Sequence, residues 1–102
     1  MLIPKKFSLA GKTYRVGISE RRLGKRRLIG EADLVKCRIY LAVKDGSRKQ
    51  SRSNIEQTYL HEVWHAIWDT LGNSKLGRDE RLADSFTNLL HQAIVTSKGK
   101  LI

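Results

Sequence analysis

Two histidines flank a glutamate in the segment His61-Glu62-Val63-Trp64-His65. In a helix, residues four apart lie on the same face, so both imidazoles can reach one metal ion. Glu62 lies about 100° around the helix from His61, where it is poorly aimed as a ligand but can accept a proton from a metal-bound water. The spacing therefore predicts a metal site at which Glu62 acts as the general base.

A second group of polar side chains, further along the chain, offers the ligand that this site lacks. Catalytic zinc usually takes three protein ligands and a water, and the two histidines supply only two. On a predicted helix that begins near Asp79, the residues Glu80, Asp84, Thr87 and His91 fall on one narrow polar line. We expect Glu80 to be the third ligand and Asp84 to accept a hydrogen bond from a ligand histidine. His91 lies two turns beyond Asp84, so we place it at the rim of the site.

These residues resemble the zincin metallopeptidases, and among them the gluzincins, whose third ligand is a glutamate on the following helix. The segment 80–86, Glu-Arg-Leu-Ala-Asp-Ser-Phe, is similar to the E-x-x-A-[ND]-x-F segment of ImmA/IrrE-type metallopeptidases. The lead-in at 30–33, Gly-Glu-Ala-Asp, and the strand after it are similar to small phage-encoded and prophage-encoded minimal zincins. The resemblance covers roughly residues 30–95.

The resemblance implies a zinc-dependent peptidase that holds one Zn²⁺ ion. It makes His61, His65 and Glu80 the zinc ligands. It makes Glu62 the general base that takes a proton from water and passes it to the leaving amine. It makes Asp84 the carboxylate that orients a ligand histidine.

An extended peptide substrate is also expected from the resemblance. It would lie along a free strand edge formed by Ile39, Tyr40 and Leu41, as in other zincins. Trp68 stands at the edge of the histidine face of its helix, so it is a further candidate for substrate contact. The substrate itself is not specified by the sequence.

Positive charge is concentrated in the first half of the chain. Residues 1–52 carry 15 Lys and Arg against 4 Asp and Glu, a net charge of +11, whereas residues 53–102 carry 5 and 6, a net charge of −1. Such asymmetry marks either a surface for a polyanion or a solvated face that keeps a small protein in solution. The densest run of cations is Arg21, Arg22, Lys25, Arg26 and Arg27.

Three functions fit these residues, and they differ in the role of the basic half. The first is the zinc peptidase, acting on a peptide or protein. The second is a metal-stabilised binding or regulatory module, of a kind that a phage could encode, contacting nucleic acid or an acidic protein through the basic half. The third is a zinc-dependent hydrolase of another bond, such as a nuclease. Binding that weakens steeply with salt would favour the second.

Composition predicts a cytoplasmic protein, in a bacterial host cell if a phage encodes it. The single cysteine, Cys37, cannot form an internal disulfide, which favours a reducing compartment. Residues 1–6 lack the apolar core of a signal peptide, and no stretch reaches the roughly 18 apolar residues of a membrane span. We therefore expect no contact with a membrane.

The chain has 102 residues, 40% of them hydrophobic, and is predicted to form one domain over residues 1–102. Alternating polar and apolar residues predict a β-hairpin of strands 5–9 and 13–18 around a short glycine turn. Residues 20–27 hold five cations and no apolar period, so an exposed connection is expected there. The residues 34–43 predict a third strand, with one side formed by Cys37, Ile39, Leu41 and Val43.

Two helices follow a predicted turn at 44–47. The first is expected to begin at Ser53, with Glu56 completing a capping box, and to end near 71–73. Its apolar stripe is Leu60, Val63, Trp64, Ile67 and Leu71. The second is expected over 79–96, with a stripe of Leu82, Ala83, Phe86, Leu89, Leu90, Ala93 and Ile94. These elements predict an α+β fold, a minimal zincin-like domain with a small, mostly antiparallel three-stranded sheet packed on two main helices.

Overall fold

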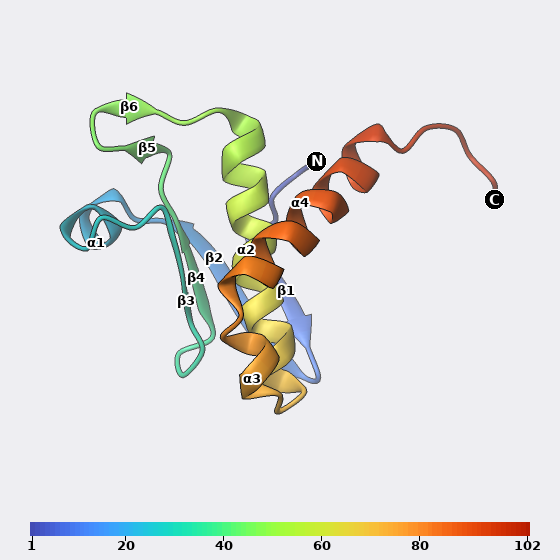
Figure 1. Ribbon diagram of the computed structural model, residues 1–102, viewed down its shortest axis with the longest axis horizontal. Coiled ribbons are helices and arrows are strands. Elements are labelled where there is room, and N and C mark those ends of the chain that lie inside the picture. Colours follow the sequence, from blue (N-terminus) through green and yellow to red (C-terminus); the bar gives the residue numbers. More distant parts are fainter.

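A computed structural model describes all 102 residues and contains both helices and strands, in agreement with an α+β chain. A four-stranded sheet covers one side of the long helix α2, and α4 crosses its other side (Figure 1). None of the helices combines the length and the apolar run needed to cross a bilayer. In chain order the elements are β1 Lys6–Leu9, β2 Lys12–Ile18, α1 Glu20–Lys25, β3 Gly30–Asp33, β4 Arg38–Leu41, β5 Lys44–Asp45, β6 Arg48–Lys49, α2 Arg52–Thr70, α3 Ser74–Gly77 and α4 Glu80–Thr96.

The sheet has the strand order β1-β2-β4-β3. The predicted hairpin is confirmed as β1 and β2, joined by a two-residue turn in which Ala10 and Gly11 both have positive φ. β2 then pairs in parallel with β4, and β3 pairs with β4 in the antiparallel direction. The expectation of three strands is therefore wrong, because the chain forms a fourth strand, β3, which lies at the edge of the sheet.

The predicted strand over 34–43 is also too long. Residues 34–37 form a tight turn between β3 and β4, in which Cys37 has φ 53° and the Asp33 carboxylate accepts a hydrogen bond from the Lys36 amide at 3.1 Å. Cys37 therefore lies in a turn and not in a strand. Ile39 and Leu41 face the core as expected, where they pack with Tyr59 and Leu60 of α2.

The segment predicted as an exposed connection contains a short helix, α1. Its Leu23 is fully buried, and the Glu20 carboxylate accepts hydrogen bonds from the Val43 and Lys44 amides at 2.6 and 3.2 Å. One buried residue in six produces no periodic pattern, which is why the sequence did not reveal this helix. The turn predicted at 44–47 is the connection of a small hairpin, β5 and β6.

α2 begins one residue earlier than expected and uses a different cap. Ser51, not Ser53, is the N-cap, and its hydroxyl accepts a hydrogen bond from the Asn54 amide at 3.1 Å. The end of the helix at Thr70 agrees with the prediction. Leu60 and Trp64 of the predicted stripe are buried and Val63 is half-buried, whereas Ile67 and Leu71 are exposed.

α4 has the predicted bounds but not the predicted orientation. Asp79 caps it by accepting a hydrogen bond from the Leu82 amide at 3.0 Å. The residues that face α2 are Ala83, Thr87 and His91, and they are the only buried residues of the helix. The expected apolar stripe, Ala83 apart, is exposed to solvent. The polar line of Glu80, Asp84, Thr87 and His91 faces α2 instead, because three of its side chains make polar contacts with residues of α2.

Gly30 is the point at which β3 approaches α2 most closely. A Cβ atom at this position would lie 2.4 Å from Cγ2 of Thr58 and 3.1 Å from Oε2 of Glu62. Thr58 cannot easily rotate away, because its hydroxyl donates a hydrogen bond to the Asn54 carbonyl at 2.9 Å. The position therefore requires glycine.

We predict that Gly30→Ala lowers the free energy of unfolding by about 1–3 kcal/mol, the usual cost of overpacking. Chemical denaturation measures this change. Gly17→Ala is the matched control, because no atom lies within 4 Å of a Cβ built there. Adding Thr58→Ser removes the clashing methyl group and should restore part of the lost stability. Equal effects of the two glycine substitutions would contradict the close approach.

Candidate metal centre

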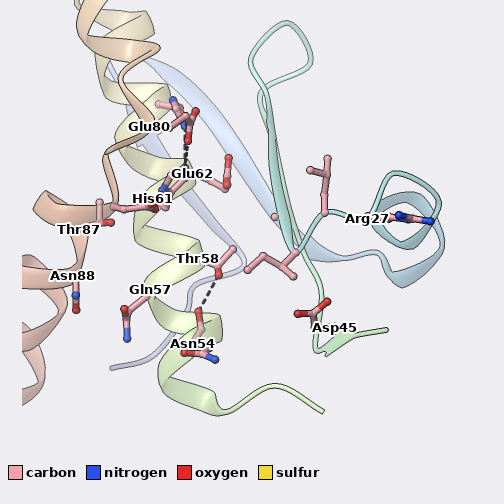
Figure 2. Close-up of a pocket in the computed structure, with 15 residues that line it drawn as sticks. Arg27, Asp45, Asn54, Gln57, Thr58, His61, Glu62, Glu80, Thr87 and Asn88 are labelled. Carbon is pink, nitrogen blue, oxygen red and sulfur yellow. Dashed lines mark hydrogen bonds and ion pairs between the residues drawn. The ribbon is translucent and has the colours of Figure 1, made fainter. Parts of the chain in front are cut away.

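Three side chains from two helices converge at one end of a cleft. His61 and His65 come from α2 and Glu80 comes from the first turn of α4. The Nε2 atoms of the two histidines lie 3.1 Å apart. The His61 Nε2 lies 2.9 Å from Oε2 of Glu80, and the His65 Nε2 lies 3.1 Å from Oε1 of Glu80. Figure 2 shows Glu80 and His61 directed toward each other. The residues predicted as ligands are thus brought together.

The outer nitrogen of each imidazole has an acceptor as its partner. Nδ1 of His65 lies 2.7 Å from the carbonyl oxygen of Gly77, and Nδ1 of His61 lies 2.9 Å from the Asp84 carboxylate. A carbonyl and a carboxylate only accept, so in both neutral imidazoles the proton is on Nδ1. The Nε2 atoms that face each other and Glu80 then carry lone pairs.

This arrangement could hold a metal ion. Two lone-pair nitrogens and a carboxylate meet within hydrogen-bond distance with no proton between them, unless one imidazole takes a second proton. A cation placed among them satisfies all three groups. Atoms bound tetrahedrally to zinc at its usual Zn–N and Zn–O distances lie about 3.3 Å apart, close to the separations observed here. The donor set of two imidazoles and one carboxylate is also that of catalytic zinc sites.

Glu62 lies beside this group and is buried. It is 8% exposed and extends from α2 toward the opposite wall of the cleft, near Gly30 of β3 (Figure 2). Burial raises the pKa of Glu62 to about 7, and His61 opposes this shift while the carboxylates of Glu80 and Asp84 add to it. A carboxyl group with this pKa can both accept and return a proton near neutral pH.

The cleft has a volume of about 790 Å³, and most of the residues that line it are polar. One wall is the histidine face of α2 together with Glu80, Asp84, Thr87 and Asn88 of α4, and the other wall is formed by residues 27–30 and Asp45. Only two of the fifteen lining residues are hydrophobic. A ligand here would meet many hydrogen-bonding groups beside apolar surface.

The predicted substrate-binding edge is wrong. β4 pairs with β2 on one side and β3 on the other, and Ile39 and Leu41 are buried in the core. Tyr40 faces the other side of the sheet, where the guanidinium of Arg22 lies 4.4 Å from its ring centre. Trp68 packs against Trp64, with ring centres 5.9 Å apart, and does not line the cleft. The edge strand beside the candidate metal centre is β3.

The placement of His91 at the rim is also wrong. His91 is 5% exposed and donates a hydrogen bond from Nε2 to the Glu56 carboxylate at 2.8 Å. The same carboxylate accepts from Arg52 at 3.0 Å and lies 3.5 Å from the Met1 amine. Glu56 therefore joins α2 to α4 instead of capping α2.

The hydrogen bond from His91 holds the pKa of the Glu56 carboxyl below its usual value of 4.5. Burial acts to raise this pKa, whereas Arg52 and the Met1 amine lower it further. A lowered pKa contributes stability above pH 4.5, and this contribution is lost as the pH falls through the lower pKa of the folded state. We predict that Glu56→Gln costs about 1–3 kcal/mol at pH 7. Its melting temperature should also fall less than that of the wild type below pH 4.5. Asp69→Asn, at an exposed carboxylate, is the control, and parallel pH profiles for all three proteins would contradict the prediction.

Of the five cations predicted as a basic surface, two are used within the fold. Arg22 pairs with Glu31 and Asp33, and Arg26 pairs with Glu31. The other three lie on α1 or two residues after its end. The β5–β6 hairpin adds further cations, and the contacts of Glu20 with Val43 and Lys44 hold this hairpin next to α1. We call this group the basic arm, and its exposed residues without an ion pair are Arg21, Lys25, Arg27, Lys44, Arg48 and Lys49.

Two features of the site could not be predicted from the sequence. The carbonyl of Gly77, which orients His65, is a backbone atom, and any residue type could supply it. The edge strand β3 is four residues long and lacks an alternating pattern. A search of known protein families, curated proteins and solved structures finds no match to this chain, so its function is inferred from this geometry.

Proposed function

We propose that the chain is a zinc-dependent peptidase built on a minimal zincin-like fold. The observation that supports it most is the meeting of two Nε2 lone pairs and the Glu80 carboxylate at 2.9–3.1 Å, with Glu62 buried beside them. The resemblance of these residues to gluzincins agrees with this set of roles. Zinc held by His61, His65 and Glu80 would polarise a peptide carbonyl and make a bound water acidic near pH 7.

The protein's own side chains have separate tasks in this proposal. Glu62 takes the proton of the attacking water and delivers it to the leaving amine, and its place beside His61 and Glu80 suits this role. Asp84 and the Gly77 carbonyl keep His61 and His65 in the tautomer that presents Nε2 to the metal. Neither of these two groups needs to touch the substrate.

β3 is the element that would hold the substrate. It pairs with β4 on one side only. On its other edge the Ala32 backbone hydrogen-bonds to Glu62, and the other backbone groups of that edge could pair with an extended peptide. Gly30 of this strand lies against Glu62, so a peptide paired with β3 would pass close to the general base.

The test measures metal content and peptide cleavage on the same protein. Untagged wild type should bind one zinc ion, as determined by mass spectrometry after reconstitution, and the loaded protein should cleave members of a peptide library. Loss of cleavage on chelation and its return with zinc would support the proposal. A protein that binds no zinc, or that binds it and cleaves no peptide, would contradict it.

The basic arm supports a second candidate function, the binding of nucleic acid. It places six cations without ion pairs on two neighbouring elements, at the end of the cleft where Arg27 and Asp45 line the wall. Phosphate contacts of this kind weaken steeply with salt. Affinity for a DNA duplex should fall with salt and be reduced more by Arg21→Glu with Lys49→Glu than by Lys5→Glu with Lys12→Glu, which place the same charge change on β1 and β2. Equal losses would show only the effect of net charge.

A further inference from the structure

One face of α4 is apolar and exposed along the length of the helix. We define the α4 face by its large side chains, which are between 38% and 66% exposed: Leu82, Phe86, Leu89, Leu90 and Ile94. Figure 1 shows α4 crossing α2 and continuing away from the sheet. Of the 15 large hydrophobic residues that are exposed in the chain, five lie on the α4 face.

All residues of the α4 face except Leu82 lie in a stretch without charge. Residues 85–97 contain no Lys, Arg, Asp or Glu, in a chain in which 29% of residues are charged. Exposed helix surfaces that only meet solvent usually carry charged side chains, whereas the centres of protein interfaces are depleted of charge. A patch of this kind on a soluble domain marks a contact with another protein surface and not with a polyanion.

We propose that the α4 face binds the α4 face of a second copy of the chain, with the two helices antiparallel. The residues Leu82, Phe86, Leu89 and Ala93 follow one another at spacings of four, three and four, as in a two-helix seam. When two copies cross between residues 87 and 88, Phe86 meets Leu89 of the second copy. In the same register Leu82 meets Ala93 of the second copy, so a large side chain faces a small one. The face is therefore complementary to itself.

Charge favours the antiparallel direction. The first half of the chain, whose strands pack against α2, has a net charge of +11, whereas α4 lies in the half with a net charge of −1. Only the N-terminal half of α4 is near the candidate metal centre and the sheet, and its C-terminal half extends outward. Antiparallel pairing places the two basic bodies at opposite ends of the helix pair, whereas parallel pairing would set them side by side at a cost in repulsion.

The size of the face predicts a weak dimer. A standard interface buries about 800 Å² on each partner, and one helix face with five partly exposed large side chains supplies less than this. We expect reversible association with a dissociation constant on the order of micromolar. The dimer does not require zinc, because its residues lie outside the candidate metal centre.

Sedimentation velocity of the full chain tests the dimer. The wild type should shift from monomer to dimer as its concentration rises from about 1 to 100 µM, the range expected for a micromolar constant. Phe86→Glu and Leu89→Glu should each remain monomeric, with unchanged helix content by circular dichroism. Gln92→Glu is the matched control, because Gln92 is exposed and lies about 120° from the centre of the α4 face. A wild type that stays monomeric, or a Phe86→Glu chain that dimerises like it, would overturn the proposal.

Cross-linking tests the direction of the helices. In a Cys37→Ser background, a mixture of Leu82→Cys chains and Ala93→Cys chains should form disulfide-linked dimers of one of each. Leu82→Cys chains alone should not, because in the antiparallel register the two positions lie about 16 Å apart along the helix axis, beyond the reach of a disulfide. Cross-linking of Leu82→Cys chains to one another would overturn the antiparallel arrangement.

Discussion

Replacement of Glu62 by glutamine is expected to lower peptide cleavage by roughly 10²–10⁴-fold, the usual contribution of a general base. Glutamine keeps the shape of the side chain but accepts no proton. Zinc content should be unchanged, because the metal contacts proposed here belong to His61, His65 and Glu80. The measurement is the cleavage rate of zinc-loaded protein at pH 7, together with zinc content by mass spectrometry.

The control for this substitution lies on the same helix. Glu56→Gln makes the same chemical change at another buried glutamate, but Glu56 contacts His91 and Arg52 and does not line the cleft. The folded Glu56→Gln protein should cleave at close to the wild-type rate at pH 7. A Glu62→Gln protein that cleaves as fast as the wild type would contradict the role of Glu62 as the base. One that loses zinc would show that Glu62 is a ligand.

The spacing of residues within one helix was enough to predict parts of the candidate site from the sequence. His61 and His65 share a face of α2 because they are four residues apart, and Glu80 and Asp84 share a face of α4 for the same reason. Capping identified where α4 begins, because Asp79 accepts a hydrogen bond from the amide three residues later. Each of these features involves residues three or four apart in sequence, so the repeat of the helix is enough to predict it.

Packing between elements was harder to predict, and α4 shows why. Its amphipathic pattern predicted that the apolar stripe would face the core. In the structure the polar line packs on α2 instead, because His91 reaches Glu56 while Glu80 and Asp84 reach His61. Each of these contacts joins residues far apart in sequence, so no local pattern reveals it. The edge strand β3 is similar, since its place depends on the parallel pairing of β2 with β4.

Zinc should stabilise this fold strongly, because its proposed ligands come from two helices and a bound ion would join them directly. α4 buries only Ala83, Thr87 and His91, and the candidate metal centre adds a second connection between α4 and α2. A ligand present at 1,000 times its dissociation constant adds about 4 kcal/mol to the free energy of unfolding. For a chain of this size that corresponds to a rise in melting temperature of roughly 15–30 °C. We therefore expect a large drop in melting temperature when a chelator removes zinc.

The substitutions His65→Ala and Asp84→Asn separate the metal from its surroundings. His65→Ala removes a ligand, so its melting temperature should not respond to zinc. Asp84→Asn leaves all three ligands but weakens the acceptor that orients His61, a change that typically costs 10-fold to 100-fold in metal affinity, or about 1–3 kcal/mol of the zinc stabilisation. Amide hydrogen exchange should show α4 opening first when zinc is removed, because α4 buries only three of its residues and its C-terminal half extends away from the rest of the fold. A wild type whose melting temperature and exchange do not respond to zinc would show that no metal joins these helices.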